Sequence, residues 1–531
     1  MKSGQSASSL PPLEPRGAPR GLAQRAIGGM FWTFSGTGVQ VVVQLLAIAA
    51  LGRLLTPAEF GLMGAATVII ACSHIVSQVG VGPAIIQRRE LDETHIRVAV
   101  TLSWLLGTAL GAIVWVGSPA IAAFYRMPEL EPILRAIAFL FPLDGMNTVA
   151  KAVLTRQLRF RLYIALDVTA YVLGYALVGV VLAWLGFGVW ALVSANLAQV
   201  GVRTVIMYFA ARHPLRPSLD RRAAGDLLGF GFGHSMAQIG TLLSQQGDNL
   251  VVGRWLGAAA LGLYGRAYNL MVMPASAFGR IINRVLFPVM SQVQDERERL
   301  AGGYERALAI VAFISLPLSA FLWVVAPEFI TLVLGPAWGG VVLPFRLFSI
   351  SLLFRMSSKI SDACTKAAGE VYVRALLQYA YAAMVVIGAI IGQHWGVGGV
   401  AVAVSVAMGL NWLSMAWLGR SVTGLSWARF FQAHVPAAMV TLVVGPAAAV
   451  IAQQARGLEV GAVPVLVVSG LVAAGTALVA TRLGPALFLG PHGLWAVNNG
   501  LGLLRRGPRR RAKAAAGRGE ELAPAAESNS Q

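Results

Sequence analysis

The sequence predicts an all-α membrane protein with about fourteen transmembrane helices. Its 531 residues are 56% hydrophobic and only 12% charged, and the mean hydropathy is +0.68. A soluble protein carries about 25% charged residues, which cover its surface against water. The shortfall indicates that much of this surface faces lipid. Long apolar stretches separated by basic clusters point to the same class.

The apolar stretches set the number of helices. A helix needs roughly 20 residues to cross the hydrocarbon core of a bilayer. The segments that meet this length are 29–51, 60–82, 98–118, 133–153, 163–185, 188–210, 229–252, 260–283, 307–334, 340–362, 375–394, 397–419, 431–453 and 459–481. An even number of spans places both ends of the chain on the same side of the membrane.

The basic residues indicate which side this is. With the N-terminus in the cytoplasm, the inner segments hold 35 of the 42 Lys and Arg residues. Cytoplasmic loops of membrane proteins carry such an excess. We therefore expect a multi-pass protein of the bacterial inner membrane with both termini in the cytoplasm. The net charge of +19 does not indicate nucleic-acid binding, because the basic residues lie between apolar stretches and not on one soluble face.

A repeated motif divides the spans into groups. GRLLTPAEFGLMGAA at 52–66 recurs as GRWLGAAALGLYGRA at 253–267, with a constant offset of 201 residues. Six helices separate the copies, so both have the same orientation, which predicts two parallel six-helix bundles. The expected segments are a cytoplasmic N-terminal segment (1–28), the two bundles (29–210 and 229–419), a cytoplasmic linker between them (211–228), helices 13 and 14 (420–482), and a cytoplasmic tail that is basic and then disordered (483–531).

Polar side chains follow one face of the first helix and, at the same offset of 201, one face of the seventh. Such side chains are costly in hydrocarbon and turn toward protein or a water-filled cavity. Hydrogen bonding between helices is the alternative reading. Because the two polar faces match in register, we favour a central cavity between the bundles. Its expected lining residues are Thr37, Gln40, Gln44, His234, Gln238, Thr241 and Gln245.

The tenth helix carries a charged face near its cytoplasmic end, with residues spaced four, three and four positions apart. They are Arg355, Lys359, Asp362 and Lys366. Two further arginines lie deep in predicted spans, Arg346 on the tenth helix and Arg266 on the eighth. The planar guanidinium suits bidentate binding of phosphate. We expect Arg266, Arg346, Arg355 and Lys359 to bind an anionic substrate; for the arginines, ion pairing is an equal alternative.

Three acidic residues within the spans are candidates for coupling to an ion, namely Asp144, Asp167 and Asp248. Asp144 and Asp167 could instead be the counter-ions of Lys151 and of a neighbouring arginine, which is the reading that we slightly favour. The residues do not distinguish H⁺ from Na⁺ as the coupling ion. No other cofactor and no metal site is predicted.

Several motifs of enzymes are absent from the sequence. It contains no GxxxxGK[ST] phosphate loop, HExxH zinc motif, CxxC pair or GxSxG elbow. The predicted outer loops are also too short for a soluble catalytic domain. We therefore expect transport and no catalytic residues, with the work driven by an ion gradient, the membrane potential or removal of the substrate.

Two blocks of sequence resemble a known family. They are WTFSGTGVQVVVQLLAIAALGRLLTPAEFGLMGAATVI and QQGDNLVVGRWLGAAALGLYGRAYNLMVMP. Both are similar to the polysaccharide-transporter branch of the multidrug/oligosaccharidyl-lipid/polysaccharide (MOP) exporter superfamily, and within it to the Wzx-type flippases. The resemblance covers roughly residues 25–480, and the LTPAEFGL and GDNLVVGRxLG segments are its most specific parts.

The resemblance implies two bundles around a V-shaped cavity that opens alternately to each side of the membrane. It also implies a substrate, an oligosaccharide on undecaprenyl diphosphate, and exchange against protons or sodium ions. A polysaccharide polymerase and a chain-length regulator would be partners, with lipids around the chain. A cation-coupled multidrug exporter of the same superfamily is the alternative. A membrane polysaccharide polymerase or ligase is a weaker one, because the sequence has no DxD motif.

Overall fold

The computed structural model describes residues 38, 40–77, 81–87, 92–211 and 217–494. Within these ranges the chain forms helices and turns, without a strand. Eight helices of the described part are long and apolar enough to cross a membrane, or nine if one bent pair of helices counts as a single span. Two shorter apolar helices, Gln40–Leu54 and Pro57–Cys72, precede them.

Most described residues of the predicted spans are helical, and turns interrupt several of the spans, for example at 138–139, 325 and 433–434. The helical stretch Tyr372–Thr423 contains two predicted spans. Helix α10 (Arg221–Gln292) contains two more, on either side of Gly257. Gly257 has φ 87° and ψ 178°, a conformation that glycine adopts far more readily than other residues, and the helix turns there.

The chain divides into two compact units. Unit 1 comprises Met1–Ala47, Ser73–Val116 and Arg135–Ser235, and unit 2 comprises Ile48–Cys72, Gly117–Leu134 and Met236–Gln531. The proposed boundaries of the two six-helix bundles remain a prediction.

Unit 1 is built from the apolar faces of short and long helices. Its core gathers Val81, Ile85, Val98, Ala99 and Val149, which are at most 1% exposed. Its elements are α3 (Val81–Gln87), most of α4 (Glu93–Tyr125), the end of α5 (Leu130–Ile137), α6 (Leu140–Arg156), α7 (Phe160–Ala170), the π-helix η1 (Tyr171–Leu177), α8 (Val178–Trp184), α9 (Val189–Ala211) and the start of α10.

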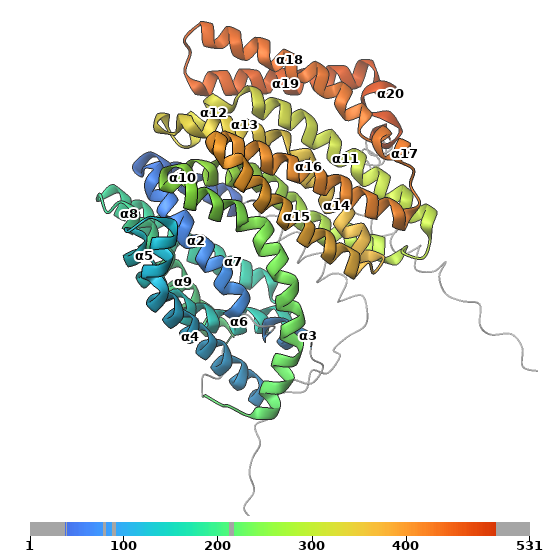
Figure 1. Cartoon of the computed structure of the whole chain (residues 1–531). Coiled ribbons are helices and arrows are strands. Elements are labelled where there is room, and N and C mark those ends of the chain that lie inside the picture. The colour runs from blue at the N-terminus through green and yellow to red at the C-terminus, as the bar shows by residue number, and fades with distance from the viewer. Residues whose placement is uncertain (1–37, 39, 78–80, 88–91, 212–216, 495–531) are drawn as a thin grey trace, which may run out of the picture. The chain divides into compact units, whose positions relative to one another are not determined.

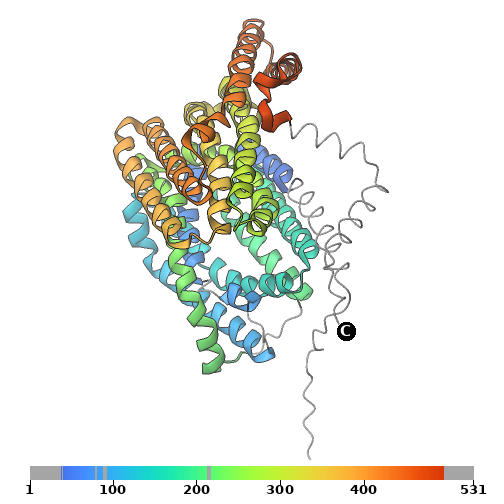
Figure 2. The ribbon, with the colours of Figure 1, turned by 90° about the vertical axis from the view of Figure 1, so that its right-hand side faces the viewer.

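Unit 2 packs around α11 (Arg297–Val324), which contacts α13, α14, α16 and α18. The predicted helices 13 and 14 form a hairpin whose first member lies along α11 (Figures 1 and 2). The other elements are α2 (Pro57–Ser77), α12 (Ala326–Val333), η2 (Pro336–Val341), α13 (Val342–Ile350), α14 (Leu352–Ala367), α15 (Val371–Gly392), η3 (Gln393–Trp395), α16 (Gly396–Thr423), α17 (Trp427–Gln432), α18 (Val435–Gly457), α19 (Ala462–Leu483) and α20 (Pro485–Phe488).

An ion pair ties the hairpin to the rest of unit 2. Arg456, in the last turn of α18, donates two hydrogen bonds to the carboxylate of Glu328 on α12, at 2.7 and 2.9 Å. A third bond from the same guanidinium, at 2.8 Å, reaches the carbonyl oxygen of Val324. Two hydrogen bonds between one guanidinium and one carboxylate fix the orientation of the two groups as well as the distance between them.

The structure adds local detail to three of the expected segments. The expected single span 340–362 is bent by 42° between α13 and α14, because the N–H of Ser351 bonds to the carbonyl three residues back, at Phe348, and tightens the turn. The expected linker 211–228 is helical from Arg221 onward. The expected tail begins with α20, which packs against α18 and α19; residues 495–531 lie outside the described ranges.

The first copy of the repeat begins α2 with a capping box. The backbone N–H of Thr56 donates to the Glu59 carboxylate at 2.6 Å, and the N–H of Glu59 returns to the Thr56 hydroxyl at 3.4 Å. In the second copy the residue at offset 201 from Thr56 is Gly257. Each copy therefore breaks one helix and starts the next at the same position, although the local chemistry differs.

Candidate functional site

The turn at Gly257 brings the two arms of α10 together. Asp248 lies on the first arm and Tyr264 on the second, and the phenol O–H of Tyr264 donates to Asp248 Oδ2 at 2.7 Å. The same first arm carries Gln245 and Thr241, about one and two turns before Asp248 respectively. Of the polar face predicted on the seventh helix, Thr241 and Gln245 line a pocket together with residues of α14 and α15.

A polar pocket of about 280 Å³ lies entirely within unit 2, between α10, α14, α15 and α16. Four basic residues and one acidic residue line it: Arg355, Lys359, Lys366, Arg374 and Asp362. The whole charged face predicted on the tenth helix therefore lines one cavity, and α15 adds a fourth cation. A small volume with excess positive charge is suited to an anion.

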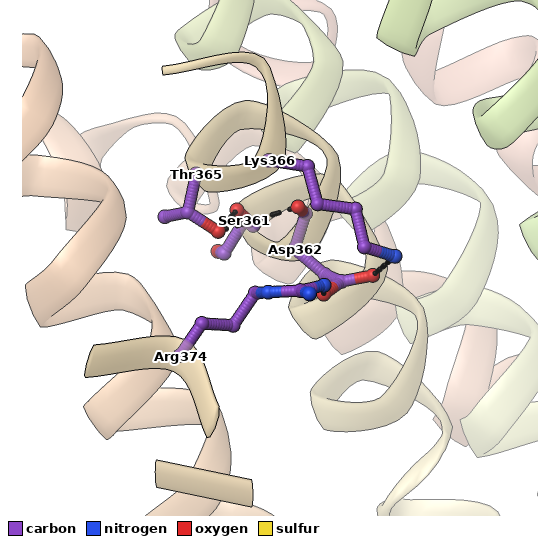
Figure 3. Close-up of polar contacts among 5 residues, drawn as sticks. All are labelled: Ser361, Asp362, Thr365, Lys366 and Arg374. Atoms are coloured by element: carbon purple, nitrogen blue, oxygen red, sulfur yellow. Dashed lines mark hydrogen bonds and ion pairs between the residues drawn. The ribbon is translucent and has the colours of Figure 1, made fainter. Parts of the chain in front are cut away.

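Asp362 neutralises part of this charge. Its carboxylate accepts from Lys366 Nζ at 2.6 Å and from Arg374 Nη1 at 2.9 Å, one bond on each oxygen (Figure 3). The three side chains come from α14 and α15 and are 24–35% exposed. Each oxygen of Asp362 therefore contacts one cation, and the carboxylate offsets part of the positive charge of Lys366 and Arg374.

Arg355 and Lys359 complete the charged lining and are placed differently. Arg355 Nη1 donates to the hydroxyl of Tyr268 at 2.9 Å, and its guanidinium lies 5.3 Å from the centre of that ring. Neither Arg355 nor Lys359 forms an ion pair among the described residues. The positive charge of this pair is therefore available to a ligand.

Neutral polar groups also line the pocket, beside apolar side chains such as Phe354, Met408 and Met415. Gln378 Nε2 donates to the Ser244 hydroxyl at 2.7 Å, which joins α15 to α10. Gln245 and Asn411 add further amides, and Tyr379 an aromatic ring. Amides and hydroxyls can both donate and accept, as sugar hydroxyls do.

Sequence reasoning missed Arg374, Gln378 and Asn411. Arg374 and Gln378 are four residues apart on α15, so their spacing was a visible signal of a polar face on the eleventh helix. Asn411 is an isolated amide in an apolar helix, which was also visible. Of the predicted cavity residues, the structure brings Thr241 and Gln245 together with Arg355 and Lys359.

Two predicted arginines lie away from this pocket's lining. Arg266 places its guanidinium 4.2 Å from the centre of the Phe60 ring, a cation–π contact between the two copies of the repeat. Arg346 donates from Nε to the carbonyl oxygen of Trp323 at 3.0 Å. Arg266 and Arg346 therefore each contact another part of the protein, and neither lines this pocket.

The remaining candidate residues lie in unit 1 or outside the residues that the structure describes. Asp167 pairs with Arg203 at 3.0 Å, the counter-ion arrangement favoured from sequence. Asp144 is half-buried on α6. Gln40 and Gln44 are half-buried on the helix Gln40–Leu54. Thr37 and the side chains of His234 and Gln238 lie outside the described residues.

Comparison with known proteins identifies the family. The model of a family described as polysaccharide biosynthesis protein matches residues 50–343, more than half of the chain. This chain belongs to the polysaccharide biosynthesis protein family. The matched range includes both copies of the repeated motif, so the resemblance drawn from those motifs is confirmed.

Curated relatives carry names that agree with this family. Lipopolysaccharide biosynthesis protein WzxC of Escherichia coli (strain K12) is 28% identical, over 63% of this chain and 68% of that protein. Teichuronic acid biosynthesis protein TuaB of Bacillus subtilis (strain 168) is 27% identical, over 80% of this chain and 88% of that protein. Succinoglycan biosynthesis transport protein ExoT of Rhizobium meliloti (strain 1021) is 26% identical, over 56% of this chain and 60% of that protein.

Solved structures identify the fold. The lipid II flippase MurJ, in an inward closed conformation, matches with a TM-score of 0.68 over 85% of this chain and 99% of its own, at 13% identity. An inward-facing multidrug resistance MATE transporter of the MOP superfamily matches with a TM-score of 0.59 over 72% of this chain and 95% of its own, at 20% identity. The prediction of an all-α, multi-pass membrane protein with the MOP fold is confirmed.

Proposed function

We propose that this protein is a flippase that moves undecaprenyl-diphosphate-linked oligosaccharides from the cytoplasmic to the periplasmic leaflet. The products would feed the synthesis of exopolysaccharide or lipopolysaccharide. The observation that carries the proposal is the pair Arg355 and Lys359, which lines a polar pocket without an acidic partner among the described residues. A transporter fold with such a pocket is suited to an anionic substrate.

The chemistry of the pocket fits the headgroup of such a lipid. Arg355 offers a planar fork to phosphate oxygens, and Lys359 offers a mobile point charge. Gln245, Gln378 and Asn411 offer amides to the hydroxyls of the adjoining sugar. The polyprenyl tail would stay in the bilayer, because moving it into a polar cavity would cost about 0.8 kcal/mol for each CH₂ group that leaves lipid for water.

Alternating access supplies the movement in this proposal. The pocket would face one side of the membrane and then the other while the headgroup stays bound. The membrane potential favours outward movement of negative charge, by about 2.3 kcal/mol per charge per 100 mV. This proposal therefore needs no chemical step in the substrate.

The names of relatives support the proposal. WzxC, TuaB and ExoT are all named for polysaccharide biosynthesis, and ExoT also for transport. MurJ, which shares the fold, is named as a flippase of lipid II. A multidrug exporter remains the alternative, but four basic residues against one acidic residue in the pocket would repel a cationic drug. A polymerase or ligase has no support in the described residues.

The proposal is tested by deleting the gene. We expect lipid-linked repeat units to accumulate on the cytoplasmic leaflet and the surface polymer to be lost, with both effects reversed by the wild-type gene. Normal polymer output in a strain without a second copy would overturn the proposal. Drug sensitivity that changes while polymer output does not would favour the exporter.

We infer that the protein lies in the inner membrane with both termini in the cytoplasm. The distribution of basic residues supports this orientation, because 35 of 42 would lie on the inner side. Fusions of a cytoplasm-active fluorescent reporter to either end are expected to fluoresce, whereas a periplasm-active phosphatase at either end is expected to be inactive. The polymerase and the chain-length regulator are proposed partners, to be tested by cross-linking in the native membrane.

A further inference from the structure

Tyr268, on the second arm of α10, contacts the proposed substrate-binding arginine but has no part in the proposed mechanism so far. Its hydroxyl accepts from Arg355 Nη1 at 2.9 Å, and the guanidinium lies 5.3 Å from the centre of its ring. Arg355 lines the pocket, whereas Tyr268 is not one of the lining residues. An effect of Tyr268 on a bound ligand must therefore pass through a lining residue, and its hydroxyl bonds to Arg355.

Aromatic neighbours hold the ring of Tyr268. Phe348 of α13 meets it edge to face, with ring centres 5.5 Å apart, and Tyr264 stacks on it at 6.4 Å. Phe348 also meets Tyr264 edge to face, at 5.3 Å. The three side chains are at most 8% exposed. Side chains packed in this way keep their rotamers, so the position of the Tyr268 hydroxyl is fixed by its surroundings.

The backbone ties Arg355 to the same phenylalanine. The N–H of Ser351 donates to the carbonyl oxygen of Phe348 at 2.9 Å, and the N–H of Arg355 donates to the carbonyl oxygen of Ser351 at 3.0 Å. The contacts therefore form a closed loop that runs from Phe348 through Ser351, Arg355 and Tyr268 back to Phe348. Both the backbone of Arg355 and its guanidinium are held relative to one buried side chain.

This loop orients the guanidinium before a ligand arrives. Arginine has several flexible bonds, and it loses rotamer freedom when it binds. In Arg355 the bond from Nη1 to Tyr268 already removes much of that freedom. The edge of the guanidinium formed by Nε and Nη2 makes no hydrogen bond within the described ranges. Two parallel N–H groups on one edge are suited to two oxygens of a phosphate.

We infer that Tyr268 is a positioning residue, which holds the Arg355 guanidinium in the orientation that binds a phosphate of the substrate. The inference rests on the proposed function, because the phosphate belongs to the diphosphate of the lipid. No covalent bond changes in this step. Fixing one such side chain in advance changes affinity by roughly two- to twelvefold.

The first test removes the hydroxyl alone. The purified full-length protein in detergent is titrated with undecaprenyl diphosphate, and the heats give the affinity. Tyr268→Phe keeps the ring and its packing but loses the acceptor, so it should bind roughly two- to twelvefold more weakly than wild type. An unchanged affinity would overturn the inference.

Tyr304→Phe is the matched control. Tyr304 is also fully buried, and its hydroxyl also bonds to a residue of α14, Ser361, at 2.8 Å, but it does not line the pocket. This variant should bind undecaprenyl diphosphate as wild type does. If it lost as much affinity as Tyr268→Phe, the cause would be a general loosening of α14, and the positioning role would be wrong.

A second arm asks whether the effect of Tyr268 depends on the guanidinium. Arg355→Lys keeps the positive charge but has a point charge in place of the planar edge, so its orientation matters less. In this background Tyr268→Phe should change the affinity by less than about twofold. The same loss in both backgrounds would show that Tyr268 acts by another route and would overturn the inference.

A measurement without substrate separates this inference from the proposed function. Thermal unfolding in detergent is compared for Tyr268→Phe, Arg355→Met and the double variant. Because the two residues share one hydrogen bond, the double variant should lose less than the sum of the two single losses. If it does, and wild type does not bind undecaprenyl diphosphate, the proposed substrate is wrong while the contact that orients Arg355 stands. Losses that simply add would overturn the inference whatever the substrate.

Discussion

Gly61 and Gly262 occupy equivalent positions in the two copies of the repeat, and each packs against the other copy in the same way. A Cβ atom on Gly61 would lie 1.7 Å from the carbonyl oxygen of Ala258, and one on Gly262 would lie 1.8 Å from the carbonyl oxygen of Pro57. Ala258 and Pro57 are themselves related by the offset of 201. The contact is therefore reciprocal within unit 2, and it requires glycine because the two backbones approach so closely.

Substituting either glycine with alanine should disrupt this contact. The added methyl group would overlap a backbone oxygen, which cannot move as a flexible side chain can, so the loss of stability should reach or exceed the roughly 1–3 kcal/mol typical of overpacking. Thermal unfolding of Gly61→Ala and Gly262→Ala in detergent measures this. Gly265→Ala is the control, since a Cβ there meets nothing within 4 Å. Equal stability of all three variants would contradict the close contact.

Replacing Arg355 with alanine should reduce polymer export at least tenfold, because truncating one partner of a buried charge contact costs roughly 2–5 kcal/mol. Arg355→Lys keeps the charge without the fork and should restore part of the export. Arg266→Ala should have a smaller effect, since Arg266 lies on the Phe60 ring and not in the pocket lining. Arg299→Ala removes a cation that is 69% exposed and is the control. Wild-type export by both Arg355→Ala and Arg266→Ala would refute the cationic site.

The Asp362→Asn variant should lose stability and export together. It removes the acceptor of two charged hydrogen bonds and leaves Lys366 and Arg374 to repel one another, at a cost of about 1–3 kcal/mol. The double variant Asp362→Asn, Lys366→Gln removes one charge of each sign and should regain part of the stability. The unfolding temperatures of the two variants provide the comparison. If the double variant were less stable than Asp362→Asn, repulsion between Lys366 and Arg374 would not be the cause of the lost stability.

Trp338→Phe should destabilise unit 2 by about 1–3 kcal/mol. Trp338 is fully buried, and its Nε1 donates to the carbonyl oxygen of Gly52 at 2.7 Å. That carbonyl lies in the last turn of the helix Gln40–Leu54. Carbonyl groups in the last turn of a helix have no backbone N–H of the same helix to accept from. Phenylalanine would keep most of the packing against Phe60, whose ring centre lies 5.3 Å away. Trp395→Phe, at a residue 72% exposed, should leave the unfolding temperature unchanged.

The sequence could predict the features that depend on one segment at a time. The hydropathy of a span depends only on its own residues, so the spans could be predicted without knowing which helices pack against them. Helical spacing alone placed Arg355, Lys359, Asp362 and Lys366 on one face of the tenth helix, and all four line the pocket. The bend at Ser351 was not visible, because no proline or glycine marks it and only the hydrogen bond to Phe348 reveals the tightened turn.

The sequence by itself determined the membrane class, the positions of the spans, the repeat and the charged face of α14. The tertiary structure decided which helices that face meets. Arg374 of α15 takes one oxygen of Asp362, Gln378 bonds to Ser244 of α10, and Tyr264 bonds to Asp248 only because α10 folds back at Gly257. These contacts join residues on different helices or on two arms of one helix. The spacing of residues along one helix shows which of them share a face, but it does not show which helix packs against that face. The site could therefore be described only from the tertiary structure.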